Sequence, residues 1–160
     1  MTSKDSEQKK ALDIAYRYLS YRARTVFEVK EKLKKGQVTP ENIEKVLLKL
    51  KDLRLVDDRS FALSMAKEIV RLRYCGPYYI RGKLRQKGID STIAEEAVLA
   101  AFSEEDEKSV AIRLATKKMK GQDLSSDKER ERLGRFIKSK GYSWEIIREA
   151  LEHIDDRKRD

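Results

Sequence analysis

Cysteine, glycine and proline are scarce in this chain. The single cysteine, Cys75, excludes an internal disulfide and a cluster of thiolate ligands. Seven glycines and two prolines in 160 residues leave few positions that would interrupt a helix. No apolar run approaches the ~18 residues of a membrane span, and no apolar stretch follows the polar segment 1–10, as in a secretory signal. We therefore expect a soluble, cytoplasmic protein with no membrane partner.

Signatures of catalysis are missing as well. The only histidine, His153, lies near the end of the chain, and no phosphate-binding loop, dinucleotide fingerprint or zinc-ligand spacing is present. A lone cysteine most often packs in a core. Its basic neighbours Arg73 and Arg81 would nevertheless lower the pKa of the Cys75 thiol and make it mildly reactive. We expect a protein that is not an enzyme and that has no cofactor or metal.

Charge is what the sequence has in abundance. Charged residues make up 41% of the chain and apolar residues 39%, and 37 Lys+Arg against 28 Asp+Glu give a net charge of +9. So few apolar residues favour several thin cores over one large core. The positive charge favours an acidic partner, with nucleic acid the first candidate.

The apolar residues recur at intervals of three and four, which predicts an all-α protein of about nine helices. The first helix is expected over 9–22, after a flexible segment 1–8. Thr25 with Glu28, and Ser126 with Glu129, have the spacing of capping boxes. Thr39 followed by Pro40 is typical of a helix start.

An internal repeat organises these helices. When Leu33, Leu84 and Ile137 are aligned, apolar residues coincide in each repeat 4 residues before the anchor and 5, 13, 14 and 17 residues after it. Gly88 and Gly141 coincide too, whereas Gly36 lies one position early, which predicts a different turn in the first unit. The columns are Val29/Ile80/Leu133, Val38/Ile89/Tyr142, Val46/Ala97/Ala150, Leu47/Val98/Leu151 and Leu50/Ala101/Ile154.

We expect three tandem three-helix repeats, resembling helix-turn-helix units, in an elongated and curved array. The repeats are assigned to 9–57, 58–103 and 104–155, followed by a charged tail, 156–160. Net charge falls from +5 (1–57) to +3 (58–103) and +1 (104–160). This gradient predicts nucleic-acid contacts in the first two repeats, and a protein-facing third repeat beginning with the acidic run 104–107.

Two clusters mix basic and aromatic residues, at 16–24 and 67–87, and such a mixture suits phosphate contacts and stacking. The alternative is that each cation lies on a solvated helix face, which is the usual place for exposed charge. The candidate contact residues are Arg17, Arg22, Arg24, Lys67, Arg71, Arg73, Tyr74, Tyr78, Tyr79, Arg81, Lys83, Arg85 and Lys87.

Several segments together resemble the RecX family of regulatory proteins. They are YLSYRAR (18–24), LRLVDDRSFA (53–62), GPYYI (76–80) with KGI (87–89), and RFIKSKGYS (135–143). The resemblance extends over roughly 9–155 and has two departures. Arg54 stands where a glycine is common in the family, and the first glycine turn is shifted at Gly36.

This resemblance implies a monomer of three tandem repeats that binds the filament of the RecA recombinase on DNA. It implies negative modulation of recombination, of ATP hydrolysis and of the co-protease function in the SOS response. Non-specific binding of single- and double-stranded DNA is also implied.

Two alternatives remain open at this stage. A stand-alone helix-turn-helix protein would bind specific duplex sequences without RecA. A helical scaffold for a protein partner would bind no DNA through its arginines.

Overall fold

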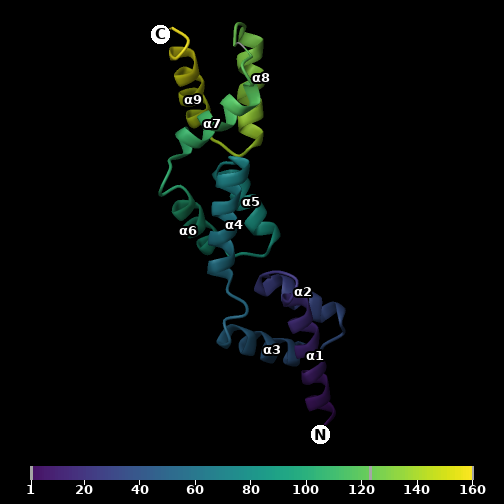
Figure 1. Cartoon of the computed structure of the whole chain (residues 1–160). Helices are drawn as coiled ribbons and strands as arrows, with labels where there is room; N and C mark the ends of the chain where they lie inside the picture. Colours follow the sequence, from purple (N-terminus) through teal and green to yellow (C-terminus); the bar gives the residue numbers. More distant parts are fainter. Residues whose placement is uncertain (1, 123, 160) are drawn as a thin grey trace.

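The computed structural model describes residues 2–122 and 124–159. Over these residues the chain is all-α, with nine helices arranged as three successive three-helix units (Figure 1). The units follow one another along an elongated body whose termini lie at opposite ends. The helices are α1 (Ser3–Leu19), α2 (Val26–Lys35), α3 (Pro40–Asp52), α4 (Asp58–Arg73), α5 (Pro77–Gln86), α6 (Ser91–Ala101), α7 (Glu107–Met119), α8 (Asp127–Ser139) and α9 (Trp144–Asp156).

The first helix begins at Ser3 and not at Lys9. The Thr2 hydroxyl accepts a hydrogen bond from the Asp5 N–H at 3.3 Å, and the Asp5 carboxylate accepts one from the Thr2 N–H at 3.0 Å, a capping box that the sequence analysis missed. Further along α1, the Glu7 carboxylate accepts the Thr39 N–H and the Asn42 side-chain amide, both at 2.8 Å, and so ties α1 to the start of α3. The segment before Lys9, expected to be flexible, is therefore helical from Ser3 and packs against repeat 1.

The predicted caps are confirmed in part. Thr25 and Glu28 form the complete capping box. At the start of α8, the Ser126 hydroxyl accepts the Glu129 N–H at 3.3 Å, but the Glu129 carboxylate accepts the Ser125 hydroxyl instead of completing the box. Thr39 occupies the expected position before Pro40, but its hydroxyl accepts the Asn42 side-chain amide at 3.1 Å and does not cap the helix backbone.

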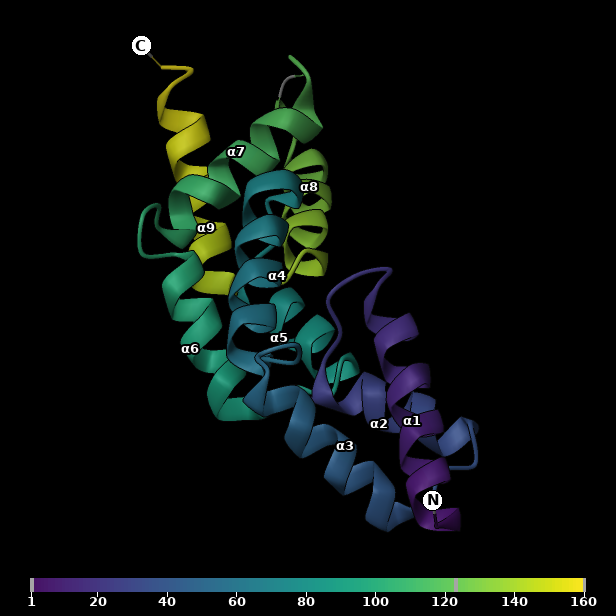
Figure 2. The same ribbon diagram turned by 60° about the horizontal axis from the view of Figure 1, so that its bottom comes forward.

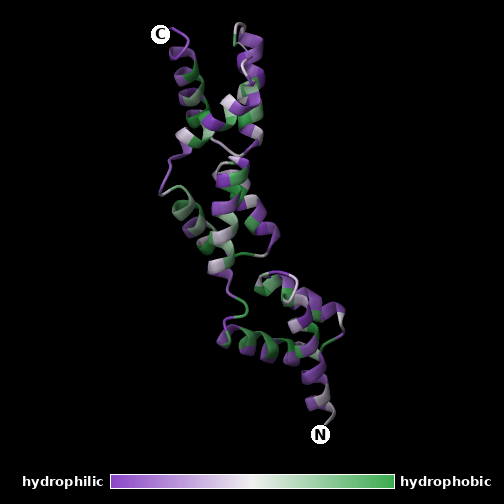
Figure 3. Cartoon of the chain, in the orientation of Figure 1, coloured by the Kyte–Doolittle hydropathy of each residue, from purple (hydrophilic) through white to green (hydrophobic). Residues whose placement is uncertain are grey.

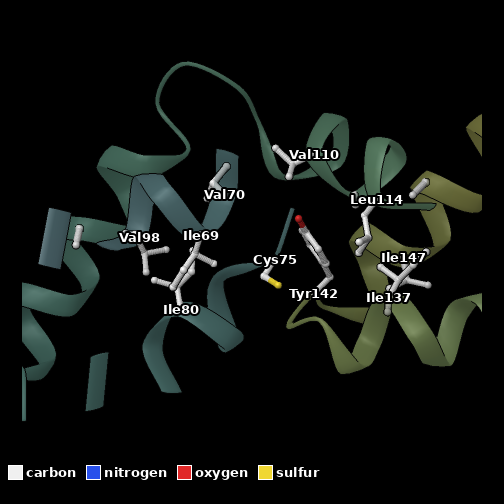
Figure 4. Close-up of a cluster of buried hydrophobic side chains, with 14 of the residues drawn as sticks. Ile69, Val70, Cys75, Ile80, Val98, Val110, Leu114, Ile137, Tyr142 and Ile147 are labelled. Atoms are coloured by element: carbon white, nitrogen blue, oxygen red, sulfur yellow. The ribbon is translucent and has the colours of Figure 1, made fainter. Parts of the chain in front are cut away.

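The repeats bury their apolar faces in two cores. Repeat 1 (α1–α3) has a core of its own, whereas repeat 2 (α4–α6) and repeat 3 (α7–α9) share one continuous core. Figure 4 shows the Tyr142 ring lying between the side chains of repeat 2 and those of repeat 3. All but two residues of the aligned columns are buried, the exceptions Ala101 and Leu151 being half-buried. Leu72 of α4, by contrast, is 55% exposed.

Each helix alternates between hydrophobic and hydrophilic segments along its ribbon, as an amphipathic helix does (Figure 3). With small bundles of this kind, much of the chain remains at the surface, which accounts for the high content of charged residues. Among the described residues, no helix combines the length and apolar character that crossing a membrane would require.

Successive repeats are joined by an interface that is itself repeated. The α8–α9 turn packs on the first turn of α5, where the Gly76 N–H donates to the Lys140 carbonyl at 2.8 Å and the Tyr78 N–H to the Gly141 carbonyl at 3.0 Å. In the same way, the α5–α6 turn packs on the first turn of α2, where the buried Thr25 hydroxyl donates to the Lys87 carbonyl at 2.7 Å.

These interfaces explain where the turns need glycine. Gly88 and Gly141 have positive φ values of 73° and 95°, and a Cβ on either would lie 2.3 Å from an atom of the preceding repeat. Gln37 adopts the same left-handed conformation, with φ 58°, and the same hydrogen bonds form around it. The expectation of a different first turn is therefore wrong. Because no described repeat packs on that turn, only the backbone angle constrains residue 37.

Candidate nucleic-acid interface

A groove lies at the junction of repeats 1 and 2. Its volume is about 590 Å³, and it runs between the α1–α2 connection, α4 and α5. Its acidic lining residues are Asp57 and Glu68. Against these two stand six cations, namely Arg22, Arg24, Arg54, Arg73, Lys83 and Lys87.

This groove continues into repeat 3. It shares the lining residues Leu72 and Arg73 with a second hollow of about 480 Å³, which is bordered by α4, α7 and α8. This second hollow shares Lys118 and Phe136 with a third hollow of about 390 Å³. These sections add the cations Lys117, Lys118, Lys120 and Arg132. We refer to the three sections together as the basic groove. In Figures 1 and 2, α8 and the α1–α2 connection lie on one side of α4, and α6 and α9 lie on the other.

The third-repeat part of the groove depends on how charge is distributed along α7. Asp106 caps this helix, with its carboxylate accepting the Ser109 N–H at 2.9 Å, and Glu107 occupies the first turn. Lys117 and Lys118 occupy the last turn. This polarity suits the helix dipole. It also gathers Lys117, Lys118 and Lys120 at the end of the helix that lies away from the acidic run 104–107, so a repeat that is nearly neutral by composition presents a basic surface at one end.

Aromatic rings hold several of these cations in place. The Arg24 guanidinium lies 3.9 Å from the centre of the Tyr18 ring, Lys117 lies 5.4 Å from that of Tyr74, and Lys118 lies 4.8 Å from that of Phe136. Cation–π contacts of this kind leave the charge exposed at one side. The cations are thus positioned for an anion without being neutralised.

Two cations of the groove are paired with one carboxylate. Glu28 contacts Arg22 at 2.7 Å and Lys87 at 3.1 Å, and so links repeat 1 to repeat 2. Burial acts to raise the pKa of Glu28, but hydrogen bonds from Arg22, the Thr25 N–H and Lys87 outweigh it and lower that pKa to about 2. Glu28 is therefore ionised at neutral pH.

The structure separates the residues singled out from the sequence. Five of the cations, Arg22, Arg24, Arg73, Lys83 and Lys87, line the junction section of the basic groove, and Tyr74 lines the next section. Arg17 lies in a different hollow, of about 630 Å³, together with Tyr18, Lys32 and Lys35. Exposed positions outside the basic groove are occupied by Lys67, Arg71 and Arg85.

The remaining three candidates have local partners. Arg81 is ion-paired with Glu95 of α6. Tyr79 is half-buried, packs against Gly141 and accepts a hydrogen bond from Arg73 at 3.2 Å. Tyr78 is 62% exposed and lies 5.7 Å from the Lys138 ammonium.

The sequence analysis missed Arg54, Arg132 and the three lysines of 117–120. The run Lys117-Lys118-Met119-Lys120 was a visible signal. The net charge of a whole repeat does not reveal this run, because acids and bases at opposite ends of the repeat cancel in the sum.

Cys75 is a packing residue in this structure. Its side chain is buried beside Tyr142 (Figure 4). Burial raises the pKa of the Cys75 thiol, and the nearby cations Lys140 and Arg73 oppose this only in part. The predicted lowering of this pKa is therefore wrong. In the described part of the chain, no three His, Cys, Asp or Glu side chains are grouped as metal ligands would be.

Comparison with known proteins assigns the family. Models of the first, second and third three-helix domains of RecX match residues 11–50, 57–98 and 104–151. The chain belongs to the RecX family. A regulatory protein RecX from Chlorobaculum tepidum is 34% identical over 94% of this chain and 91% of its own length. The RecX of Bacillus subtilis is 33% identical over 93% of this chain, but is longer, so that 56% of it is covered.

A solved structure supports the same assignment. The crystal structure of RecX from Lactobacillus salivarius superposes with a TM-score of 0.85 at 29% identity, over 94% of this chain and 98% of that one. The names of these relatives are those of regulatory proteins, so this RecX family member is a regulatory protein and not an enzyme.

Proposed function

We propose that this RecX family member binds the RecA–DNA filament through its basic groove and lowers the activity of the recombinase. The observation that carries the proposal is the continuity of the groove over all three repeats. Ten cations and three acids line it, an excess that favours a polyanion following its length. A RecA filament on DNA presents such a polyanion in an extended form.

Non-specific contact with the phosphate backbone fits the residues better than base reading does. Arginine and lysine make up most of the charged residues of the lining, and phosphate contacts by such residues carry no sequence information. The stand-alone helix-turn-helix alternative requires a preferred duplex sequence without RecA. Binding of that kind would contradict the proposal.

Titration into a RecA ATPase assay on single-stranded DNA tests the proposal. We expect the wild-type chain to lower the rate of ATP hydrolysis, and the variant R73E/K117E to need at least about tenfold more protein for the same effect, since a tenfold loss corresponds to about 1.4 kcal/mol. The matched control is K9E/K49E, which makes the same charge change at exposed positions outside the groove.

Two outcomes would contradict the proposal. One is an unchanged ATPase rate at salt concentrations where both proteins bind DNA. The other is equal weakening by R73E/K117E and by the control, which would make net charge the cause. The variant K67E/R85E distinguishes the contacts predicted from the sequence from those of the basic groove. Lys67 and Arg85 belong to the predicted contacts but lie outside the groove.

A further inference from the structure

In repeats 1 and 2, an ion pair at equivalent positions links the second helix to the third. In repeat 1, Lys30 contacts Glu44 at 3.4 Å. In repeat 2, Arg81 at the equivalent position binds Glu95, with Nη2 and Oε2 3.0 Å apart. Both pairs lie between positions 3 residues before and 11 residues after the repeat anchor. This pair is therefore a regular feature of the repeat.

Repeat 3 departs from this pattern at both positions of the pair. Gly134 stands where the cation would be, and Arg148 stands where the acid would be. Arg148 is exposed and forms no ion pair within residues 2–122 and 124–159. A third change adjoins them, because Trp144 of repeat 3 replaces Pro40 and Ser91 of the other repeats.

These three changes open a slot between α8 and α9. Its volume is about 350 Å³, with Gly134 at its base and Trp144, Ile147 and Leu151 along its sides. The charged residues of its lining are three arginines and two glutamates, namely Arg130, Arg135, Arg148, Glu131 and Glu152. Leu151 is half-buried, whereas the equivalent Leu47 and Val98 are 4% and 3% exposed. The Trp144 side chain is 58% exposed. An exposed indole beside an apolar recess and an arginine has the composition of an interaction hot spot.

Helix packing does not require glycine at residue 134. A Cβ there would lie 3.6 Å from its nearest neighbour, the Ile147 Cγ2, an ordinary contact distance. Alanine would also be the better helix former. What the glycine does provide is the open base of the slot.

We propose that this slot docks an acidic peptide segment of a partner protein, with one apolar side chain of the peptide lying over Gly134. The charge argument is the reversal from Glu44 and Glu95 to Arg148, because a carboxylate from the partner would replace the acid that repeat 3 lacks. Although Glu131 and Glu152 also line the slot, arginines outnumber them there, and Glu131 is already paired with Arg135. The volume suits one or two apolar side chains. The slot shares no lining residue with the basic groove, so this proposal stands independently of the proposed function.

The test is a selection of random short peptides displayed on phage, with the full-length chain as bait. The variant G134K/R148E serves for subtraction, since it restores the ion pair that repeats 1 and 2 already contain and is expected to fold. Trp144 is the only tryptophan in the chain, so its fluorescence reports occupancy of the slot directly.

We expect the recovered peptides to carry carboxylates around an apolar residue and to change Trp144 emission saturably. Their affinity should fall at least about tenfold in G134K/R148E and by less than twofold in K128E, which removes a cation from the same helix outside the slot. An oligothymidylate should not displace them.

Three results would overturn the proposal. They are the absence of any peptide specific for the wild-type chain, the recovery of basic peptides, and displacement by the oligothymidylate, which would make the slot a nucleic-acid surface. A change of oligomeric state in G134K/R148E, measured by sedimentation, would make a second copy of this chain the occupant and would also contradict it.

Discussion

At the scale of single residues, backbone angle and close approach decide which side chains the turns accept. Gln37 and Arg54 adopt positive φ values of 58° and 55°, in a region where a non-glycine residue is strained by roughly 1 kcal/mol. The angle at Arg54 is one that glycine adopts without strain, which gives a physical reason for the glycine that the family resemblance implies there. At Gly88, the same angle is combined with the approach of Phe27, so two separate constraints act on one residue.

Introducing glycine at residue 37 and removing it at residue 88 should therefore change the free energy of unfolding in opposite directions. We expect Q37G to raise the free energy of unfolding by about 0.5–1 kcal/mol, because glycine relieves the strain. G88A should lower it by more than about 2 kcal/mol, because the new Cβ would collide with the Phe27 side chain. Urea unfolding followed by circular dichroism measures both. Equal effects of the same sign would contradict this account of the turns.

At the scale of elements, the junction between repeats 1 and 2 differs from that between repeats 2 and 3. Repeats 2 and 3 share a core that includes the buried Tyr142, whose hydroxyl donates to the Tyr74 carbonyl at 2.8 Å. Repeat 1 has a separate core, and its link to repeat 2 includes several polar contacts. Glu28 binds Lys87, and the Val26 N–H donates to Asp58 at 2.9 Å. Repeat 1 should therefore unfold before the other two.

Removing the charge of Glu28 should weaken this junction. We expect E28Q to lower the stability of the first unfolding transition by about 1–3 kcal/mol, since it removes charged hydrogen bonds of a largely buried side chain. The second transition should be unchanged. The control E31Q, in the same helix, breaks only an exposed pair with Lys34 and should cost less than about 0.5 kcal/mol.

The same junction should respond to acid. Because the pKa of Glu28 is lowered in the folded state, its contribution is complete above the ordinary value of 4.5 and is lost as the pH falls toward about 2. We expect the first transition of the wild-type chain to weaken over this range, and that of E28Q to weaken less. Urea melts at several pH values measure the difference, and equal pH dependence would contradict the role given to Glu28.

At the scale of the whole molecule, stacking of the repeats joins local cation clusters into one surface. The sequence predicted nucleic-acid contacts in repeats 1 and 2 from the net charge of each repeat and from the basic and aromatic clusters at 16–24 and 67–87. In the structure, α7 and α8 bring Lys117, Lys118 and Arg132 into line with Arg73 of repeat 2. Repeat 3 thus presents a basic face toward the groove and the apolar slot of α8 and α9 away from it.

A salt titration distinguishes the groove from the charge gradient. For binding to oligothymidylate, we expect K117A/K118A to reduce the slope of log K against log salt by about 0.7 for each phosphate contact removed. The pair K9A/K49A should leave the slope unchanged. If substitutions in repeats 1 and 2 alone altered the slope, the charge gradient would describe binding better than the continuous groove does.

The sequence by itself determined the helices, the repeat and the buried columns. Apolar spacing is a local property, and the amphipathic period fixes which residues of a helix face its neighbours. Anchors such as Leu33, Leu84 and Ile137 could therefore be read without coordinates. So could the family, because its motifs are contiguous runs such as those at 53–62 and 135–143.

Only the tertiary structure decided which charges act together. Arg22 and Lys87 lie far apart in the chain and meet only because the α5–α6 turn packs on α2. Lys67 and Arg73 are close in sequence, yet Arg73 lines the groove and Lys67 does not. A binding partner meets the charges that lie close together in space, which need not be close together in the sequence. A composition count therefore predicted only the sign of the partner's charge, while the packing of three repeats determined where the cations that such a partner would contact lie together.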